Sequence, residues 1–245
     1  MLVSIITICY NSEAVIRKTI ESVLAQSYTD MEYLIIDGAS KDCTVAAAEE
    51  YADRFAEKGI AYRIFSEPDR GIYDAMNKGI RKASGELIGM INSGDWYEPD
   101  AVQTAVSAYE ESPYDLFFAD INLIRENGST LVKHSRYDRF PTSRHWNHPT
   151  MFVTSRTYRE LGLYRCEGIH DDFEFYLRAR RAEKKISIVN KVIANFVTGG
   201  ASNSKTFEKC KARCMDRYRG YRLNGYSRLA ILECIGIEAA KYILS

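Results

Sequence analysis

Short apolar runs alternate with longer segments of helical periodicity along the first half of the chain. Five of these runs have the length and composition of buried strands: residues 2–8, 33–37, 60–65, 87–91 and 115–119. Three of the intervening segments carry apolar side chains at helical spacing: residues 13–26, 42–57 and 99–111. The alternation predicts an α/β fold, with a mostly parallel central sheet flanked by helices, over about residues 1–120.

The pattern is less regular after residue 120. Asn127-Gly128 between two apolar stretches predicts a hairpin, and the polar residues 136–149 predict a long loop. A helix at about 170–183 follows. Two strands and a turn are predicted after it: residues 186–189, residues 192–197 and Gly199-Gly200.

The last forty residues form a distinct segment. Residues 205–228 hold eight Lys/Arg against two Asp/Glu, and residues 229–244 are largely apolar. One interpretation is a helical hairpin that covers the sheet. The other is a basic and apolar surface that rests on anionic lipid. The pattern leaves both open and slightly favours the covering hairpin.

Composition narrows the class of protein. The 245 residues are 46% hydrophobic with a formal net charge of zero, which is typical of a globular protein and gives no reason to expect nucleic-acid binding. Six scattered Cys without a CxxC pair indicate a reducing compartment. The first residues resemble a strand rather than a signal peptide, and no apolar run is long enough to span a membrane. We therefore expect a cytoplasmic protein.

Two carboxylates stand at predicted strand ends. Asp37 closes the second run, and Asp95 ends the Asn-Ser-Gly-Asp stretch after the fourth. Ligands bind at the carboxyl ends of strands in open α/β sheets. A single Asp there is best explained as a turn or cap residue. Two in the same context favour a site for a nucleotide and a metal ion.

Other polar residues fall at the same predicted edge. Tyr10 and Asn11 end the first run, and an aromatic face with an amide suits a base or ribose. No glycine fingerprint of a dinucleotide fold is present there, which argues against a Rossmann oxidoreductase. Gly71 opens a helix whose N-terminus suits a phosphate, with Arg70 or Lys78 adding positive charge.

Adjacent carboxylates begin the helix near residue 170. The helix dipole alone explains Asp171. Asp172 precedes an apolar stretch, so one of the two carboxylates is a candidate to point into a cleft, where it could serve as a general base.

These motifs together resemble a known family. The chain resembles the family-two glycosyltransferases of GT-A fold, and among them bacterial enzymes of the colanic-acid type that build exopolysaccharide or lipopolysaccharide repeat units. Six stretches within residues 3–203 carry the resemblance, in the order of the family: SIITICYN, EYLIIDGASKDCT, SEPDRGIYDAMNKGI, SGELIGMINSGDWYEPDA, HDDFEFYLRA and NFVTGGASN.

The resemblance implies a donor site in the first half of the chain. Ile8, Tyr10 and Asp37 would line the nucleotide base and ribose, with Asn11 beside them. Asp69 and Lys78 would lie near the nucleotide and its phosphates.

The resemblance also implies the catalytic groups. Asp95 matches the last acid of the Asp-x-Asp metal motif, and Asp172 matches the catalytic base. Ser93 replaces the first acid, which weakens the case for a metal without removing it. His148 or His170 is a candidate for a further ligand.

The implied activity is inverting transfer of a sugar from a nucleoside-diphosphate sugar, most simply a UDP-sugar, with Mg²⁺ or Mn²⁺. The acceptor would be a hydroxyl of a lipid-linked saccharide at the inner face of the cell membrane. Residues 1–204 would form the GT-A domain, with a nucleotide-sugar-binding half at 1–120 and an acceptor half at 121–204. Residues 205–245 would form a helical tail. Two alternatives remain: a nucleotidyltransferase that makes an activated sugar, and a non-catalytic subunit that binds nucleotide sugars.

Overall fold

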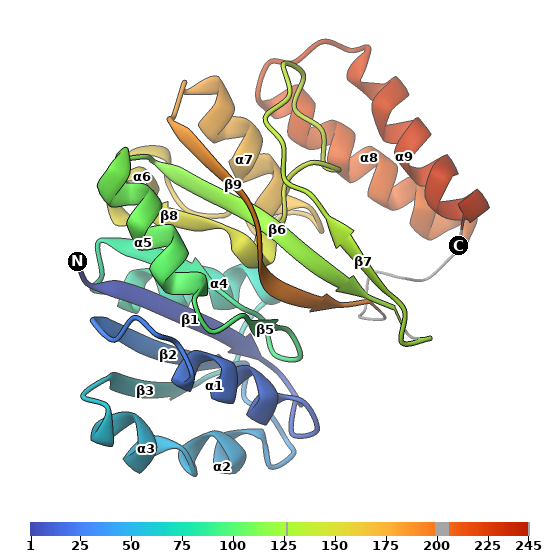
Figure 1. Cartoon of the computed structure of the whole chain (residues 1–245). Helices are drawn as coiled ribbons and strands as arrows, with labels where there is room; N and C mark the ends of the chain where they lie inside the picture. Colours follow the sequence, from blue (N-terminus) through green and yellow to red (C-terminus); the bar gives the residue numbers. More distant parts are fainter. Residues whose placement is uncertain (126, 199–205, 245) are drawn as a thin grey trace.

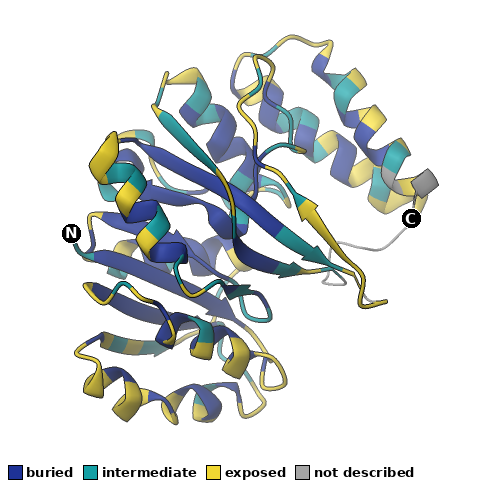
Figure 2. Cartoon of the chain, viewed as in Figure 1, coloured by how far each residue is buried: buried dark blue, intermediate teal, exposed yellow. Residues whose placement is uncertain are grey.

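A nine-stranded sheet forms the centre of the protein (Figure 1). The computed structural model describes residues 1–125, 127–198 and 206–244. Four parallel strands in the order β3-β2-β1-β4 make up one half of the sheet. Their bounds are Val3–Cys9 for β1, Met31–Asp37 for β2, Ala61–Ser66 for β3 and Leu87–Met90 for β4. The first four of the five predicted strands are confirmed to within two residues. Three of them are buried along their whole length (Figure 2), as strands covered on both faces should be.

The second half of the sheet is mixed. Short strand β8 (Phe152–Thr154) joins β4 to β6 (Leu116–Ile124) and runs antiparallel to both. Strand β9 (Ile186–Val197) is parallel to β6, and β5 (Trp96–Tyr97) and β7 (Thr130–Lys133) pair antiparallel with β9 and β6. The sheet is therefore parallel in the first ninety residues and mixed beyond.

Of two predictions for this half of the sheet, one is confirmed and one is wrong. The hairpin at Asn127-Gly128 is confirmed, with Gly128 at a positive φ of 79° between β6 and β7. The two strands predicted at 186–189 and 192–197 are one strand, whose register against β6 shifts between Ala119 and Ile121. The predicted Gly199-Gly200 turn and the boundary at residue 204 lie outside the described residues.

Helices cover both faces of the sheet. One face is covered by α1 (Ile16–Leu24), α2 (Thr44–Glu49), α3 (Ala52–Glu57) and α5 (Ala101–Glu111). The other face is covered by α4 (Ile72–Lys82), α6 (Ser155–Leu161) and α7 (Asp171–Arg181). Alternation along β1 supplies both cores: Val3 and Ile5 point to the first, Ile6 and Ile8 to the second. A one-turn 3₁₀ helix, η1 (His148–Thr150), precedes β8.

The C-terminal segment is a helical hairpin, as predicted. Helices α8 (Phe207–Leu223) and α9 (Ala230–Leu244) lie at the end of the molecule remote from α2 and α3 (Figure 1). Helix α8 packs against α7, and Tyr221 and Cys234 join the core beneath. The hairpin therefore covers α7 more than the sheet itself. Within the described ranges, no helix has the length and apolar character needed to cross a membrane.

Candidate active site

The carboxyl ends of four parallel strands form one edge that carries most of the predicted site. Cys9 pairs with Asp37 across β1 and β2, and Asp37 pairs with Ser66 across β2 and β3. The loops that follow each strand therefore leave the sheet side by side. Ser93, after β4, donates its backbone N–H to Ile8 O at 3.3 Å, which brings the fourth loop to the first.

Tyr10, Gly38 and Asp69 meet at this edge. A Cβ atom on Gly38 would lie 2.5 Å from Asp69 Oδ2 and 3.3 Å from the Tyr10 ring, so a larger residue there would displace the Asp69 carboxylate from this position. The side chain of Tyr10 is 60% exposed. An open aromatic face beside a carboxylate at a sheet edge is a suitable platform for a nucleoside.

Asp37 is buried beneath this platform. Its Oδ2 accepts hydrogen bonds from Ser40 N at 3.0 Å and Ser66 Oγ at 2.6 Å, and its Oδ1 accepts from the Ser40 hydroxyl. Asn11 adds to the same arrangement, since its N–H donates to Ser40 Oγ and its Oδ1 accepts from Lys41 N, both at 2.8 Å. Asp37 and Asn11 thus fix the shape of the loops.

Ile8 and Lys78 have similar supporting positions. The Ile8 side chain is buried in the second core. Lys78 Nζ donates to Pro68 O at 2.6 Å and lies 3.5 Å from Glu67 Oε1. Lys78 therefore ties α4 to the loop that presents Asp69, and its charge lies close to that loop.

Asp95 is a buried carboxylate after β4. Its Oδ1 accepts from Val197 N at 3.0 Å. Burial raises its pKa to about 7, and this hydrogen bond opposes the rise. Ser93, at the position of the first acid, is neutral, and its hydroxyl shares a 2.9 Å hydrogen bond with Ser12 Oγ. This loop therefore offers one carboxylate, which a cation would stabilise in its ionised form.

The residues present fit a metal ion held by a single protein carboxylate. Within the described residues, no three His, Cys, Asp or Glu side chains cluster as a metal site. In the same part of the chain, Asn92 Oδ1 and His148 Nε2 are buried without a hydrogen-bond partner. His170, the other candidate for a further metal ligand, already contacts a carboxylate: its Nδ1 lies 3.1 Å from Asp216 Oδ2.

The adjacent acids of α7 have different environments. Asp171 is fully buried, and it accepts from Glu167 N at 2.6 Å and Gly168 N at 3.0 Å and pairs with Arg219 at 2.8 Å. It is a structural residue. Asp172 is half-buried, and its Oδ1 accepts from Tyr73 Oη at 2.9 Å and Phe173 N at 2.7 Å.

Asp172 belongs to the same region as the strand edge. Tyr73 lies in the first turn of α4, four residues after Asp69, so its hydroxyl joins Asp172 to the loops at the strand edge. Burial lowers the pKa of His148 and the charge of Asp172 partly restores it, which indicates that the two residues lie near each other.

Helix α8 holds the loop that leads to Asp172. Asp216 Oδ2 accepts from Ile169 N at 3.0 Å and His170 N at 2.9 Å. A Cβ atom on Gly168 would clash with the Asp216 carboxylate and the Arg219 guanidinium, so the loop lies directly against α8. Arg219 completes the clamp through Asp171. The C-terminal hairpin therefore positions the candidate base.

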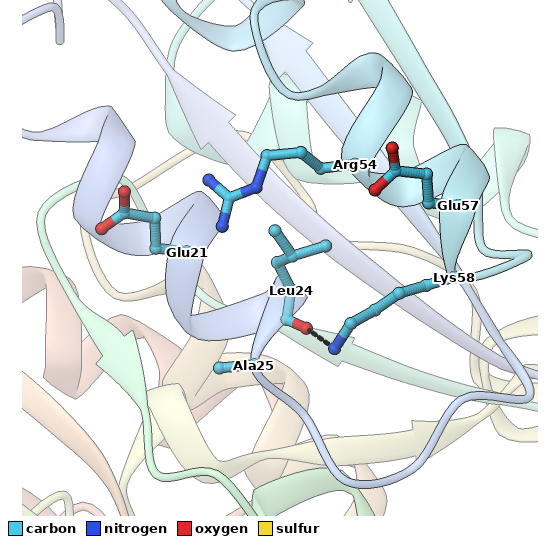
Figure 3. Close-up of a pocket in the computed structure, with 6 residues that line it drawn as sticks. All are labelled: Glu21, Leu24, Ala25, Arg54, Glu57 and Lys58. Carbon is cyan, nitrogen blue, oxygen red and sulfur yellow. Dashed lines mark hydrogen bonds between the residues drawn. The ribbon is translucent and has the colours of Figure 1, made fainter.

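A surface pocket elsewhere has no such chemistry (Figure 3). It is lined by residues from the C-terminal ends of α1 and α3: Glu21, Leu24, Ala25, Arg54, Glu57 and Lys58. Lys58 Nζ is occupied by Leu24 O at 2.7 Å. Because α1 follows β1 and returns along the sheet, this pocket lies at the opposite edge from Asp37 and Asp95.

Comparison with known proteins decides the family. The model of glycosyl transferase family 2 matches residues 4–179, which include every site residue predicted from the sequence. The chain belongs to glycosyl transferase family 2. It is therefore a glycosyltransferase, and the expected family is confirmed.

A relative and two solved structures agree. An uncharacterized glycosyltransferase of Mycobacterium tuberculosis is 34% identical over 212 residues, covering 83% of this chain and 78% of the relative. TarS of S. aureus in complex with UDP has a TM-score of 0.71 at 15% identity and covers 100% of this chain and 72% of TarS. The mannosyltransferase PcManGT of Pyrobaculum calidifontis, in complex with GDP-Man and Mn2+, also has a TM-score of 0.71 at 14% identity, covering 98% and 69%. The predicted GT-A fold is confirmed.

Several supporting residues of this glycosyltransferase were not predicted. From the sequence alone, Tyr73 is one more apolar residue of the helix after Gly71, and Asp216 and Arg219 belong to a helix rich in charged residues. Their roles depend on contacts across 46 to 99 residues. Gly38 gave a weak signal, as a glycine directly after a strand-ending Asp.

Proposed function

We propose that the enzyme transfers a sugar from a nucleoside-diphosphate sugar to a hydroxyl of a lipid-linked saccharide, with inversion at the anomeric carbon. The observation that carries the proposal is the arrangement at the sheet edge. The open face of Tyr10 lies beside Asp69, and the half-buried Asp172 accepts a hydrogen bond from Tyr73 in α4, the helix that follows Asp69. Family membership supports the class of reaction.

The proposed donor is a UDP-sugar. TarS, which shares the fold, was crystallised with UDP, and PcManGT was crystallised with GDP-Man, so a nucleotide-sugar donor suits the fold. Tyr10 would stack on the base, and the buried Asp37 would hold the loop on which the ribose rests. Asp69 and Lys78 would lie toward the phosphates.

Asp95 would hold Mg²⁺ or Mn²⁺ together with oxygens of the donor diphosphate. The ion supplies positive charge that neutralises the nucleoside diphosphate as it leaves. The buried position of Asp95 and its raised pKa support this role, because a bound cation would offset the cost of ionising it. The Mn2+ bound to PcManGT is consistent with it.

Asp172 would act as the general base. Among the described contacts, both hydrogen bonds that it accepts go to Oδ1, so Oδ2 is the oxygen that would take the proton of the acceptor hydroxyl. The acceptor oxygen then attacks the anomeric carbon as the bond to the diphosphate breaks, and this single displacement inverts the configuration. No protein acid is needed, because the diphosphate leaves without protonation.

The proposed acceptor is a saccharide carried on a lipid, as in the synthesis of surface polysaccharide repeat units. The reaction would then take place at the inner face of the cell membrane, with the enzyme peripheral to it. The resemblance of the chain to enzymes of that class supports this part of the proposal.

A thermal-shift panel tests the donor assignment. UDP-, GDP- and dTDP-sugars are added to the enzyme with and without Mn2+, since a ligand that binds the folded state raises its melting temperature. We expect one nucleotide class to raise it, and the rise to be larger with Mn2+. The absence of any shift across the panel would contradict the proposed function.

A further inference from the structure

Helix α9 presents a continuous apolar face to the outside of the protein. Its exposed side chains recur at intervals of three and four residues, so they lie on one side of the helix. They are Leu229, which directly precedes the helix, and Leu232, Ile235, Ala239 and Tyr242 within it; the four larger ones are 71%, 64%, 52% and 63% exposed. Figure 2 shows exposed residues of the hairpin in yellow, alternating with buried residues in dark blue. We call these five residues the α9 face.

The described acidic side chains of α9 turn inward. Glu233 accepts from Thr142 at 2.5 Å and from Tyr221 at 3.2 Å. Glu238 is buried and pairs with Arg213 at 2.9 Å and Arg217 at 3.1 Å. The α9 face therefore contains no acid, although a solvent-facing helix surface normally carries charged residues. An apolar patch of this kind marks a surface that another body covers.

The hairpin that carries the α9 face also exposes cations. They are Lys209, Lys211, Arg222 and Arg228, and Glu208 is the one acid in the exposed class among the described side chains of residues 206–242. Arg228 directly precedes Leu229. The whole chain has a net charge of zero, so this positive charge is a local property of the hairpin.

We infer that the α9 face docks the enzyme on an anionic lipid bilayer. An exposed apolar helix face within a hairpin that also exposes Lys and Arg is typical of a helix that lies in the membrane interface, with cations at the headgroup phosphates. A second copy of the chain is a poorer occupant. A symmetric pairing of two α9 faces would bring the same cations together, with few exposed acids to neutralise them. The reason for docking rests on the proposed function, because a lipid-linked acceptor would lie in the membrane. The docking itself can be measured without any sugar substrate.

Sedimentation of the full chain with vesicles tests the inference. Vesicles of phosphatidylcholine alone are compared with vesicles that also contain phosphatidylglycerol. We expect binding to the anionic vesicles that weakens with salt. The variant L232S/I235S should bind on the order of tenfold more weakly or worse, because two apolar side chains no longer enter the interface. The variant K211E/R228E should lose roughly fivefold for each cation, the equivalent of about 1 kcal/mol.

The matched control is L131S/V132S on β7, where the same kind of apolar side chains are 51% and 41% exposed but lie outside the hairpin. It should bind vesicles like the unchanged protein. No binding by the unchanged protein, or equal loss in both serine variants, would overturn the inference. So would a dimer in analytical ultracentrifugation that L232S/I235S dissociates, because a second copy would then cover the α9 face.

A thermal shift with UDP and Mn2+ on the same samples separates the two proposals. An intact shift without vesicle binding would refute the docking alone. Vesicle binding without a shift by any nucleotide sugar would refute the donor assignment and leave the docking supported.

Discussion

The adjacent acids of α7 allow the proposed base to be tested against its own neighbour. We expect Asp172→Asn to abolish transfer while donor binding and stability are retained. Asp171→Asn should instead lower the stability, while the folded enzyme still transfers sugar. The two substitutions are chemically identical and one residue apart, so they differ only in the environment that the structure gives each side chain.

The magnitudes follow from the contacts. In Asp172→Asn the amide oxygen can still accept the bonds from Tyr73 and Phe173 N, so the free energy of unfolding should change by less than about 1 kcal/mol. Because an amide cannot take the acceptor's proton, the transfer rate should fall roughly 10²–10⁴-fold. At residue 171 the change weakens two backbone hydrogen bonds and an ion pair with Arg219, whose side chain is 31% exposed. After allowance for that exposure, we expect a loss of about 1–3 kcal/mol, or roughly 2–10 °C in melting temperature.

The assay is transfer of labelled sugar to a membrane lipid fraction, measured well below the melting temperature of both variants, with UDP binding measured in parallel. Full transfer by Asp172→Asn would refute the assignment. A folded but inactive Asp171→Asn beside an active Asp172→Asn would make Asp171 the base. If both stay active, the base lies elsewhere. Asp120 and Glu174 are the next acids, but both are buried and engaged, by His134 at 2.7 Å and by Arg178 at 3.0 Å.

Three further predictions concern the metal, the pH dependence and the donor loop. Asp95→Asn should remove most of the stimulation of transfer by Mn2+, and full activity of the unchanged enzyme in excess chelator would contradict this. Burial tends to raise the pKa of Glu32, but hydrogen bonds from Ser4 and Ser84 outweigh it and lower the pKa. Its contribution to stability is therefore present above its unfolded-state pKa of about 4.3 and lost as the pH falls through the lower folded-state value. Glu32→Gln should flatten the acid side of a melting-temperature profile; an unchanged profile would refute it. Asp37→Ala should weaken UDP binding in calorimetry by disordering the loop at Ser40, and an unchanged affinity would exclude that role.

The parallel half of the fold was predictable because each of its strands is a short apolar run bounded by polar turns. Burial on both faces makes β1, β2 and β4 near-continuous hydrophobic runs, which are visible in the sequence. Strands β5 and β8 were not predicted, since two or three residues carry no periodic signal and are fixed by pairing with β9 and β4. The single strand β9 was predicted as two because Asn190-Lys191 interrupts its apolar run.

The candidate site also could be predicted only in part from the sequence. Asp37 and Asp95 were identified because Asp is disfavoured in strands and a carboxylate is costly to bury unless it is paired. The burial of Asp37 beneath Ser40 and Ser66 could not be seen, since it depends on how three loops meet. The inward-facing arginines of the tail were equally hidden. Their charges suggested a basic surface, whereas Arg213 and Arg217 pair with Glu238 inside the hairpin.

Hydrogen–deuterium exchange with UDP and Mn2+ tests the central claim, that the donor binds at the carboxyl edge of the parallel strands. The account predicts slower exchange in the loops at residues 8–12, 37–41, 67–71 and 92–95. It predicts no change around the pocket of Figure 3, at residues 21–25 and 54–58. Protection confined to that pocket, or bound UDP that leaves all four edge loops unchanged, would contradict the account.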